Sequence, residues 1–302
     1  MRFLALLVVF VLPASIRAED KKKDPNQIGN RDVGKGINFY SLEKEMALGK
    51  QLAQEVAKQA KLVDDPLISE YANRTGQNLV RNSDAKVPFT FQVIESDSPN
   101  AFALPGGYVF INTGLIELAE EEAEFAGAIS HEIAHVAARH MTRQATKSEI
   151  ANMATIPLSV ILGGWVGYAA RQGAAAAIPM TFLSFSRRDE AEADYLGVKY
   201  MYAAGYDPTG VITVFEKLDA LNHRKPGTLG RLLSTHPMDS DRIQKAQKEI
   251  QEILPARDQY VVNTSDYHAM RQRVFAMEAR KKPEQQDNRP RLIRPLENGH
   301  EN

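Results

Sequence analysis

The sequence predicts an α+β fold that is mainly helical and contains a small β-sheet. Several segments carry apolar residues at helical spacing, and one segment alternates apolar and polar residues as a half-buried strand does. No repeat period appears along the 302 residues, which are enough to bury one sizeable core. We therefore expect one main domain over residues 39–255.

The N-terminal end has the layout of a secretory signal. A positively charged start precedes an apolar run from Phe3 to Leu12, and small residues then lead to Ala18. We expect residues 1–18 to be a signal peptide; an uncleaved anchor is the alternative, because Ile16 is unusual three residues before a cleavage site. Residues 19–38 are polar, and we expect a flexible linker there.

The composition excludes several classes of protein. The 37 basic and 38 acidic residues nearly cancel, so we expect no nucleic-acid partner. The chain has no cysteine and therefore no disulfide, no thiol nucleophile and no lipid-modified cysteine. An exported chain of this kind is typical of the bacterial envelope, and we expect it in the periplasm.

Two packing helices and two strands are expected before residue 115. "SLEKEMALGKQLAQEV" has apolar residues on one helical face, and "DDPLISEYANRTGQNLV" begins a second helix with Asp65 as its cap and Pro66 at its first position. "VPFTFQVIES" alternates apolar and polar residues, and "GYVFIN" follows a Pro/Gly turn, so two adjacent strands are expected.

Helices dominate the rest of the chain. One long helix is expected from about Glu120 to Gln144 and another from about Ser186 to Ala204, with two more beginning near Pro208 and Asp239. Residues 256–302 are expected to form a short C-terminal extension with a disordered tail.

The stretch "AISHEIAHVAARH" contains the pattern HExxH. His131 and His135 are four residues apart, so on a helix both imidazoles can reach one ion from one face. Glu132 lies beside them, where a glutamate can act as general base on a water molecule. His140 follows His131 by nine residues and would face away from the pair on a continuous helix, so we expect it either at the surface or as a residue that supports the metal ligands without being one.

The segment "SRRDEAEADYLG" supplies a candidate third ligand on a later helix. Arg187, Glu190 and Asp194 share one helical face, whereas Glu192 points to the other side. Glu190 is the expected ligand, and Asp194 can accept a histidine N–H and fix its tautomer. The alternative is a solvent-exposed helix whose charged side chains pair with one another. This alternative does not explain why Glu190 and Asp194 share one face.

Together these motifs resemble the HtpX/BepA-type zinc endopeptidases, relatives of the CAAX prenyl protease and the Oma-type mitochondrial proteases. The resemblance extends from "SLEKEMALGKQLA" through "NAFALPGGYVFINTGLI" and "HEIAHVAARH" to "STHPMDSDRI". It implies a zincin-type fold whose edge strand lies beside the active site. It also implies one zinc ion per subunit, held by His131, His135 and Glu190, with Glu132 as the catalytic base.

The resemblance assigns further roles. It implies that His236, in the "HP" turn, is a catalytic residue that stabilises the oxyanion or occupies the open zinc position. If His236 occupies that position no water is activated there, and we predict that the wild-type enzyme is largely latent. Arg187 and Arg242 are expected to support the site together with Asp194. Asn100 and Ala101 would begin a substrate-binding edge strand that pairs with an extended peptide.

Residues 150–186 are almost free of charge and lie between the two ligand helices. The run from Ile150 to Ala170 is long enough to span a bilayer, but a single crossing would separate His131 from Glu190. We prefer a flap over the site or a peripheral membrane contact, with a spanning hairpin as the alternative.

The sequence therefore predicts a zinc-dependent endopeptidase, a hydrolase acting on peptide bonds. Unfolded or misassembled envelope proteins are its expected substrates, and the role in protein quality control is implied by the resemblance alone. The alternative is a latent or vestigial metalloprotease that acts as a chaperone-like binding protein. The complete set of ligands and base favours the enzyme.

Overall fold

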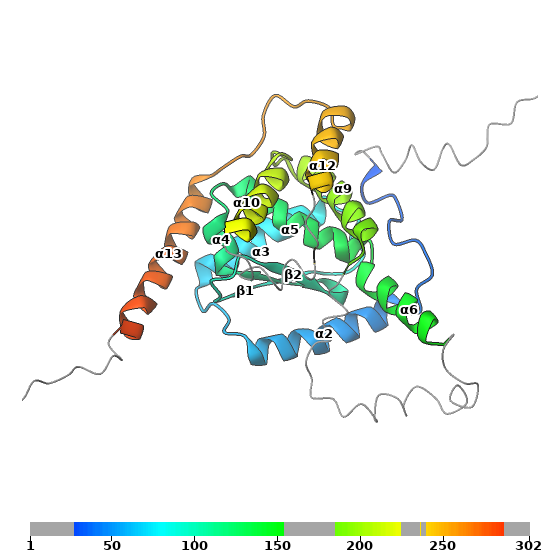
Figure 1. The fold of residues 1–302 in the computed structure, drawn as a ribbon, viewed down its shortest axis with the longest axis horizontal. Coiled ribbons are helices and arrows are strands. Elements are labelled where there is room, and N and C mark those ends of the chain that lie inside the picture. Colours follow the sequence, from blue (N-terminus) through cyan, green and yellow to red (C-terminus); the bar gives the residue numbers. More distant parts are fainter. Residues whose placement is uncertain (1–26, 154–184, 225–235, 237–239, 287–302) are drawn as a thin grey trace, which may run out of the picture.

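The computed structural model describes residues 27–153, 185–224, 236 and 240–286. Within them, a three-stranded mixed sheet has one helix on one face and a larger group of helices on the other (Figure 1). The predicted mainly helical α+β class is confirmed. None of the helices among these residues combines the length and apolar character needed to cross a bilayer. The expected signal peptide, most of the apolar segment and the expected disordered tail lie outside the described residues.

The first two helices begin where the sequence predicts. Helix α2 (Leu42–Gln59) has Ser41 as its cap, and helix α3 (Pro66–Arg81) has Asp65, whose carboxylate accepts hydrogen bonds from two backbone N–H groups of the first turn. These caps pair N–H groups that would otherwise have no partner within the helix. The prediction of Asp65 as cap and Pro66 at the first position is confirmed.

The sheet has the order β1-β3-β2. Strand β1 (Thr90–Ile94) runs parallel to β3 (Tyr108–Asn112), and β2 (Ala101–Leu104) pairs antiparallel with β3 through the short turn η2 (Pro105–Gly107). The residue pattern predicted two strands and the family resemblance an edge strand beginning at Asn100; "AFAL" forms this third strand because the Pro/Gly turn folds it back onto "YVFIN" as a hairpin. The result places β2 at an edge of the sheet.

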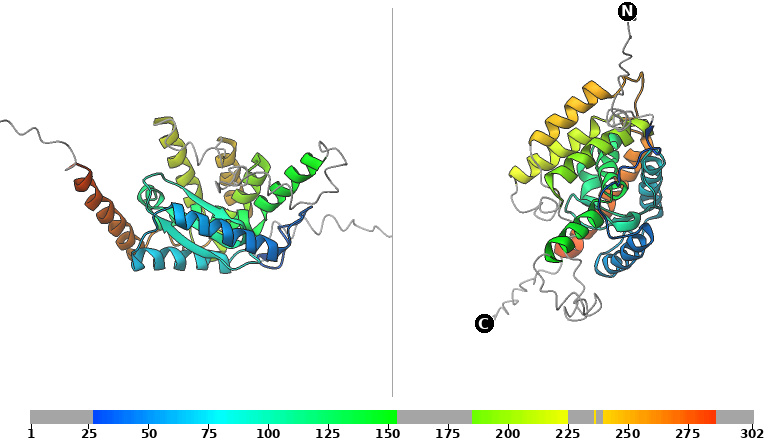
Figure 2. Two further views of the ribbon diagram at one scale, coloured as in Figure 1. Left: turned by 90° about the horizontal axis from the view of Figure 1, so that it is seen from below. Right: turned by 90° about the vertical axis from the view of Figure 1, so that its right-hand side faces the viewer.

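Helix α2 covers one face of the sheet and crosses in front of the strands when the molecule is seen from below (Figure 2). A small apolar cluster joins the two layers, made of Ala53, Val56, Ile94, Leu104 and Phe110. A side chain at Gly49 would place its Cβ only 1.7 Å from the carbonyl oxygen of Pro105. The absence of a side chain there lets α2 lie directly against the turn between β2 and β3.

The other face carries the main core. Helix α5 (Glu122–Ala137) is buried along its whole length and packs on β2, α3, α9 (Arg187–Ala204) and α10 (Gly210–Arg224). Helix α12 (Ser240–Ile253) lies against α9 and α10, and the short α4 (Thr113–Leu118) follows β3. The helix with the HExxH pattern is therefore the centre of the molecule (Figure 1).

The single long helix expected from Glu120 to Gln144 was a wrong prediction. Helix α5 ends at Ala137, and α6 (His140–Met153) begins after Arg139, whose φ of 57° is left-handed. The Arg139 side chain donates from Nε to Oε2 of Glu45 at 2.8 Å and from Nη2 to the carbonyl of Tyr40 at 2.6 Å. Contacts with distant residues stabilise this break, so no local glycine or proline signals it.

Both ends of the described chain pack more closely than expected. Residues 27–38 were expected to be a flexible linker, but Val33 is buried and Arg31 forms a buried ion pair with Asp84 at 2.8 Å. After residue 255, α13 (Ser265–Gln286) packs on α3 and α4 through three buried side chains, Tyr267, Met270 and Val274. A few apolar or paired residues are enough to dock a mainly polar segment.

Candidate metal centre and active site

Helices α5 and α9 bring four potential metal ligands together. His131 and His135 lie on α5, Glu190 lies in the first turn of α9, and His236 reaches the same point from the segment before α12. All four side chains are buried. One ligand atom from each lies within 4.8 Å of the others.

The spacing of these atoms fits a tetrahedral metal. Nε2 of His131 lies 3.0 Å from Nε2 of His135 and 3.3 Å from Nδ1 of His236. The Glu190 carboxylate oxygens lie 3.4 Å from both α5 imidazoles and 3.0 Å from Nδ1 of His236. Neighbouring ligands of tetrahedral zinc are about 3.3 to 3.4 Å apart, and imidazole and carboxylate are ligands that zinc accepts. The residues present therefore fit a zinc ion.

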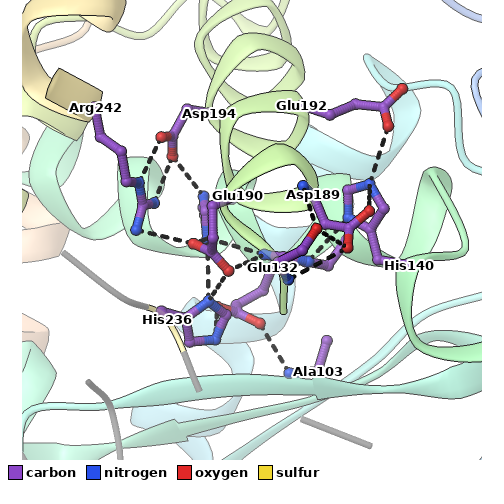
Figure 3. Close-up of polar contacts among 12 residues, drawn as sticks. Ala103, Glu132, His140, Asp189, Glu190, Glu192, Asp194, His236 and Arg242 are labelled. Carbon is purple, nitrogen blue, oxygen red and sulfur yellow. Dashed lines mark hydrogen bonds and ion pairs between the residues drawn. The ribbon is translucent and has the colours of Figure 1, made fainter. Parts of the chain in front are cut away.

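Asp194 and Arg242 support this cluster from one side (Figure 3). Oδ1 of Asp194 lies 3.0 Å from Nδ1 of His131, which directs Nε2 of that ring toward the cluster. Arg242 donates to both Asp194 oxygens, at 2.7 and 2.8 Å, and its Nη1 lies 2.9 Å from Oε2 of Glu190. One guanidinium thus holds the expected ligand and the expected supporting carboxylate in fixed positions.

Burial and neighbouring charges shift the ionisation of the cluster. Burial lowers the pKa of His131, but hydrogen bonds with Asp194 and Glu190 outweigh it and raise that pKa to about 9. Burial lowers the pKa of His135 well below its usual value. Burial raises the pKa of Glu190, yet the charge of His236 and hydrogen bonds to the histidines bring it well below its usual value. The Glu190 carboxyl group is therefore ionised among the imidazoles, and a carboxylate must be ionised to bind a metal.

Glu132 lies between the cluster and the edge strand. Its Oε2 accepts a hydrogen bond from the backbone N–H of Ala103 at 3.0 Å, and its Oε1 lies 3.6 Å from Nε2 of His236. Burial raises the pKa of this carboxyl. A carboxylate with a raised pKa close to a metal site suits proton transfer near neutral pH.

The edge strand lines a small cavity beside this glutamate. The cavity measures about 30 Å³, and its lining includes Asn100, Ala101, Leu115, Ala128, Phe215 and Leu218. Because the N–H of Ala103 points away from β3 toward Glu132, the alternation of an antiparallel strand directs the backbone groups of Ala101, which is buried, to the same edge. Both expected substrate-binding residues therefore lie next to the cluster.

Two expectations about polar residues need correction. Arg187 was expected beside Glu190 and Asp194, but it is the exposed first residue of α9, one turn before the buried groups. His140 was expected to face away from the pair, yet it is buried against His135, because the break at Arg139 turns the chain back. The backbone N–H of Ala103 was not foreseen, since a backbone group carries no signal in the sequence.

Comparison with known proteins agrees with this geometry. A sequence model of peptidase family M48 matches residues 66–250. The chain is 29% identical over 275 residues to the beta-barrel assembly-enhancing protease of Yersinia pestis, covering 88% of this chain and 55% of that protein. It is 30% identical over 247 residues to the protein of the same name from Escherichia coli strain K12, covering 78% of this chain and 49% of that protein.

A mitochondrial relative is similar over a shorter region. The mitochondrial metalloendopeptidase OMA1 of Schizosaccharomyces pombe is 32% identical over 208 residues, covering 66% of this chain and 56% of that protein. The chain thus spans about half the length of these curated relatives. The family match includes all of α5 and α9 together with His236 and Arg242, and it covers more than half of the chain. The predicted family is confirmed, and the chain belongs to peptidase family M48.

Proposed function

We propose that this chain is a zinc-dependent endopeptidase that hydrolyses peptide bonds of unfolded or misassembled proteins in the bacterial envelope. The main support is the buried cluster of His131, His135, Glu190 and His236 at tetrahedral spacing, with Glu132 directly beside it. The names of the two bacterial relatives, beta-barrel assembly-enhancing proteases, support an envelope role in protein quality control.

Each side chain has a distinct task in this proposal. His131, His135 and Glu190 would hold one zinc ion per subunit, which would polarise the substrate carbonyl as a Lewis acid and lower the pKa of a water molecule. Glu132 takes the proton of the attacking water and passes it to the leaving amine. The imidazole of His236 donates a hydrogen bond to the oxyanion that forms on the substrate.

The edge strand supports an extended substrate. A β-strand edge can bind another extended backbone through main-chain hydrogen bonds, and among the described residues no further strand lies beyond β2, whose Ala101 directs its N–H and C=O to the edge where Glu132 lies. A folded protein cannot present such a backbone without local unfolding. Unfolded or misassembled chains are therefore the substrates that this edge favours, and with the expected signal peptide the periplasm is the expected location.

The alternative, a chaperone-like binding protein with a vestigial site, is less well supported. Burying a carboxyl group away from water is unfavourable, and a protein that only binds peptides gains nothing from a buried Glu132 between β2 and His236. A peptidase needs a base at this position.

Replacing Glu132 with glutamine tests the proposal. Glu132→Gln should lower casein cleavage by at least about 10²-fold, the scale of general base catalysis, while zinc content measured by elemental analysis stays at one ion per chain. Glu216→Gln, which changes an exposed glutamate of α10, is the matched control and should leave both unchanged. Cleavage by zinc-loaded Glu132→Gln at the wild-type rate would contradict the role of Glu132, and a wild-type chain that binds no zinc would contradict the metal.

A further inference from the structure

His135 makes a second contact on the side of its ring away from the metal cluster. Its Nδ1 lies 3.0 Å from Nδ1 of His140, which is fully buried. Nε2 of His140 in turn lies 3.2 Å from Oε2 of Glu192. The three side chains form a continuous chain of polar contacts from the cluster to a partly exposed carboxylate.

A guanidinium group also contacts Glu192, the outer end of this series of polar contacts. Nη1 of Arg143 lies 3.3 Å from the same Glu192 oxygen that His140 contacts. Arg143 and His140 belong to α6, whereas Glu192 belongs to α9, so the contacts join two helices. Figure 3 shows His140 and Glu192 on the opposite side of Glu190 from Asp194 and Arg242.

The break between α5 and α6 is what presents His140 to His135. On an unbroken helix the two residues would be five positions apart and would not face each other. Arg139 instead takes a left-handed conformation that is strained for a residue other than glycine, and buried Glu45 holds its side chain. Such strain persists only where the surroundings enforce it, and it is concentrated at functional sites.

The donors and acceptors permit one assignment when His135 binds a metal through Nε2. Nδ1 of His135 then carries the proton and donates to Nδ1 of His140, and Nε2 of His140 donates to Glu192. We propose that His140, supported by Glu192, is a positioning residue that fixes the tautomer and ring orientation of His135. The inference depends on the proposed zinc site. It gives each histidine of the HExxH pattern its own support, Asp194 for His131 and His140 for His135.

The test measures the zinc dissociation constant of the full chain by competition with a chelator. Loss of an outer hydrogen-bond partner of a metal-binding histidine typically weakens affinity about 10- to 100-fold, and we expect this range for His140→Leu. His140→Asn should restore most of the affinity, because its Oδ1 can accept the same N–H. His223→Leu, at a histidine whose side chain is 76% exposed, is the matched control and should leave the affinity unchanged.

A second pair of variants tests the outer end and covers the case in which His140→Leu does not fold. Glu192→Leu should weaken zinc binding about tenfold, whereas Glu192→Gln, which still offers an acceptor to His140, should keep nearly wild-type affinity. In the cobalt-substituted protein, Glu192→Leu should also alter the ligand-field absorption spectrum, because the ring of His135 is less constrained.

The outcomes separate this inference from the proposed function. If the wild-type chain binds no zinc, the proposed function fails. If the wild-type chain binds zinc and the folded leucine variants bind it equally well, only the role of His140 is overturned. Equal losses in His140→Leu and His140→Asn would also overturn it, because they would indicate packing of the ring and not its hydrogen bond.

Discussion

His236 has its two ring nitrogens in two different parts of the site. Nδ1 lies 3.0 Å from Oε1 of Glu190 and 3.3 Å from Nε2 of His131, whereas Nε2 lies 3.6 Å from Oε1 of Glu132. Nδ1 would therefore be the fourth protein ligand of a zinc ion held by this cluster. A zinc ion with four protein ligands has no open position for water, as in structural zinc sites. We accordingly predict that the zinc-loaded wild-type protein is largely latent.

Removing this imidazole should release the latency. His236→Ala leaves the other three ligands in place and opens the fourth position, so casein cleavage should rise by at most about tenfold if the open state is about a tenth of the wild-type population and released latency outweighs the lost oxyanion donor. His268→Ala, at an exposed histidine of α13, serves as control and should not change the rate. A fall of about 10² to 10³ in His236→Ala would show instead that its contribution to oxyanion stabilisation outweighs any block.

Side-chain type and spacing predict much of the cluster, but not all of it. The helical period places His131 and His135 on one face and Glu190 and Asp194 on another, and the packing of α5 on α9 brings both faces together. No spacing rule identifies His236, a single histidine before a proline, and it was assigned through family resemblance. The N–H of Ala103 could not be predicted, because every strand residue has one.

At the scale of the elements, the edge strand is positioned by the helix on the opposite face of the sheet. Helix α2 lies against the turn that joins β2 to β3, with no space for a side chain at Gly49. Gly106 in the same turn has a φ of 74°, and a Cβ there would lie 2.6 Å from Cα of Met46. A change in this contact therefore moves the strand that Glu132 contacts.

Gly49→Ala tests this dependence. The added Cβ would overlap the carbonyl oxygen of Pro105, and overpacking of this kind costs about 1 to 3 kcal/mol of the free energy of unfolding. Urea denaturation measures that cost, and casein cleavage should fall because β2 is displaced. Lys50→Ala, at the exposed neighbouring position of α2, is the control. An unchanged urea midpoint in Gly49→Ala would mean that α2 and the turn separate easily.

Local patterns predict the caps of the elements better than their interruptions. Asp65 and Pro66 mark the start of α3 through interactions within four residues. The break at Arg139 depends on Glu45, which is 94 residues away in the sequence, so no window along the chain reveals it. The same break explains why His140 was misplaced by helical geometry.

At the scale of the whole molecule, polar contacts tie the outer segments to the core. Buried Lys199 of α9 has its Nζ 3.9 Å from Oε1 of Glu249 on α12, in the same helix pair that Arg242 and Asp194 join near the metal cluster. The polar sequence of residues 27–38 gave no sign that they also dock. Individual buried residues, Val33 and Arg31, attach this segment to the core. A search for hydrophobic periodicity does not detect individual residues of this kind.

The Lys199 and Glu249 pair should make stability depend on pH. Burial raises the pKa of Glu249 from 4.5 to about 8, although the charge of Lys199 opposes this shift. Between these two pH values the folded protein binds a proton that the unfolded chain has released, so the free energy of unfolding should fall as pH rises, by at most about 1.4 kcal/mol per pH unit. This contribution to stability is fully present below pH 4.5 and is lost above about pH 8.

Urea unfolding at several pH values between 5 and 8 measures this dependence. Glu249→Gln should flatten the decline, because glutamine has no proton to release. Glu252→Gln, at an exposed glutamate of the same helix, should leave the decline as in the wild type. If Glu249→Gln keeps the wild-type slope, the pH dependence has another source.

The distance along the chain between the cluster residues has a consequence for biosynthesis. His131 and His236 are 105 residues apart, and Arg242, which holds Glu190 in place, follows later still. A ribosome or an export channel releases a chain from its N-terminus, so the helix with the HExxH pattern emerges long before its partners. A nascent or prematurely terminated chain therefore carries two histidines and a glutamate but no completed metal site. Such a chain lacks Glu190, the third expected ligand, until α9 is made, and lacks Arg242, which holds Glu190 in place, until α12 is made, so we expect stable zinc binding only once both helices have been synthesised.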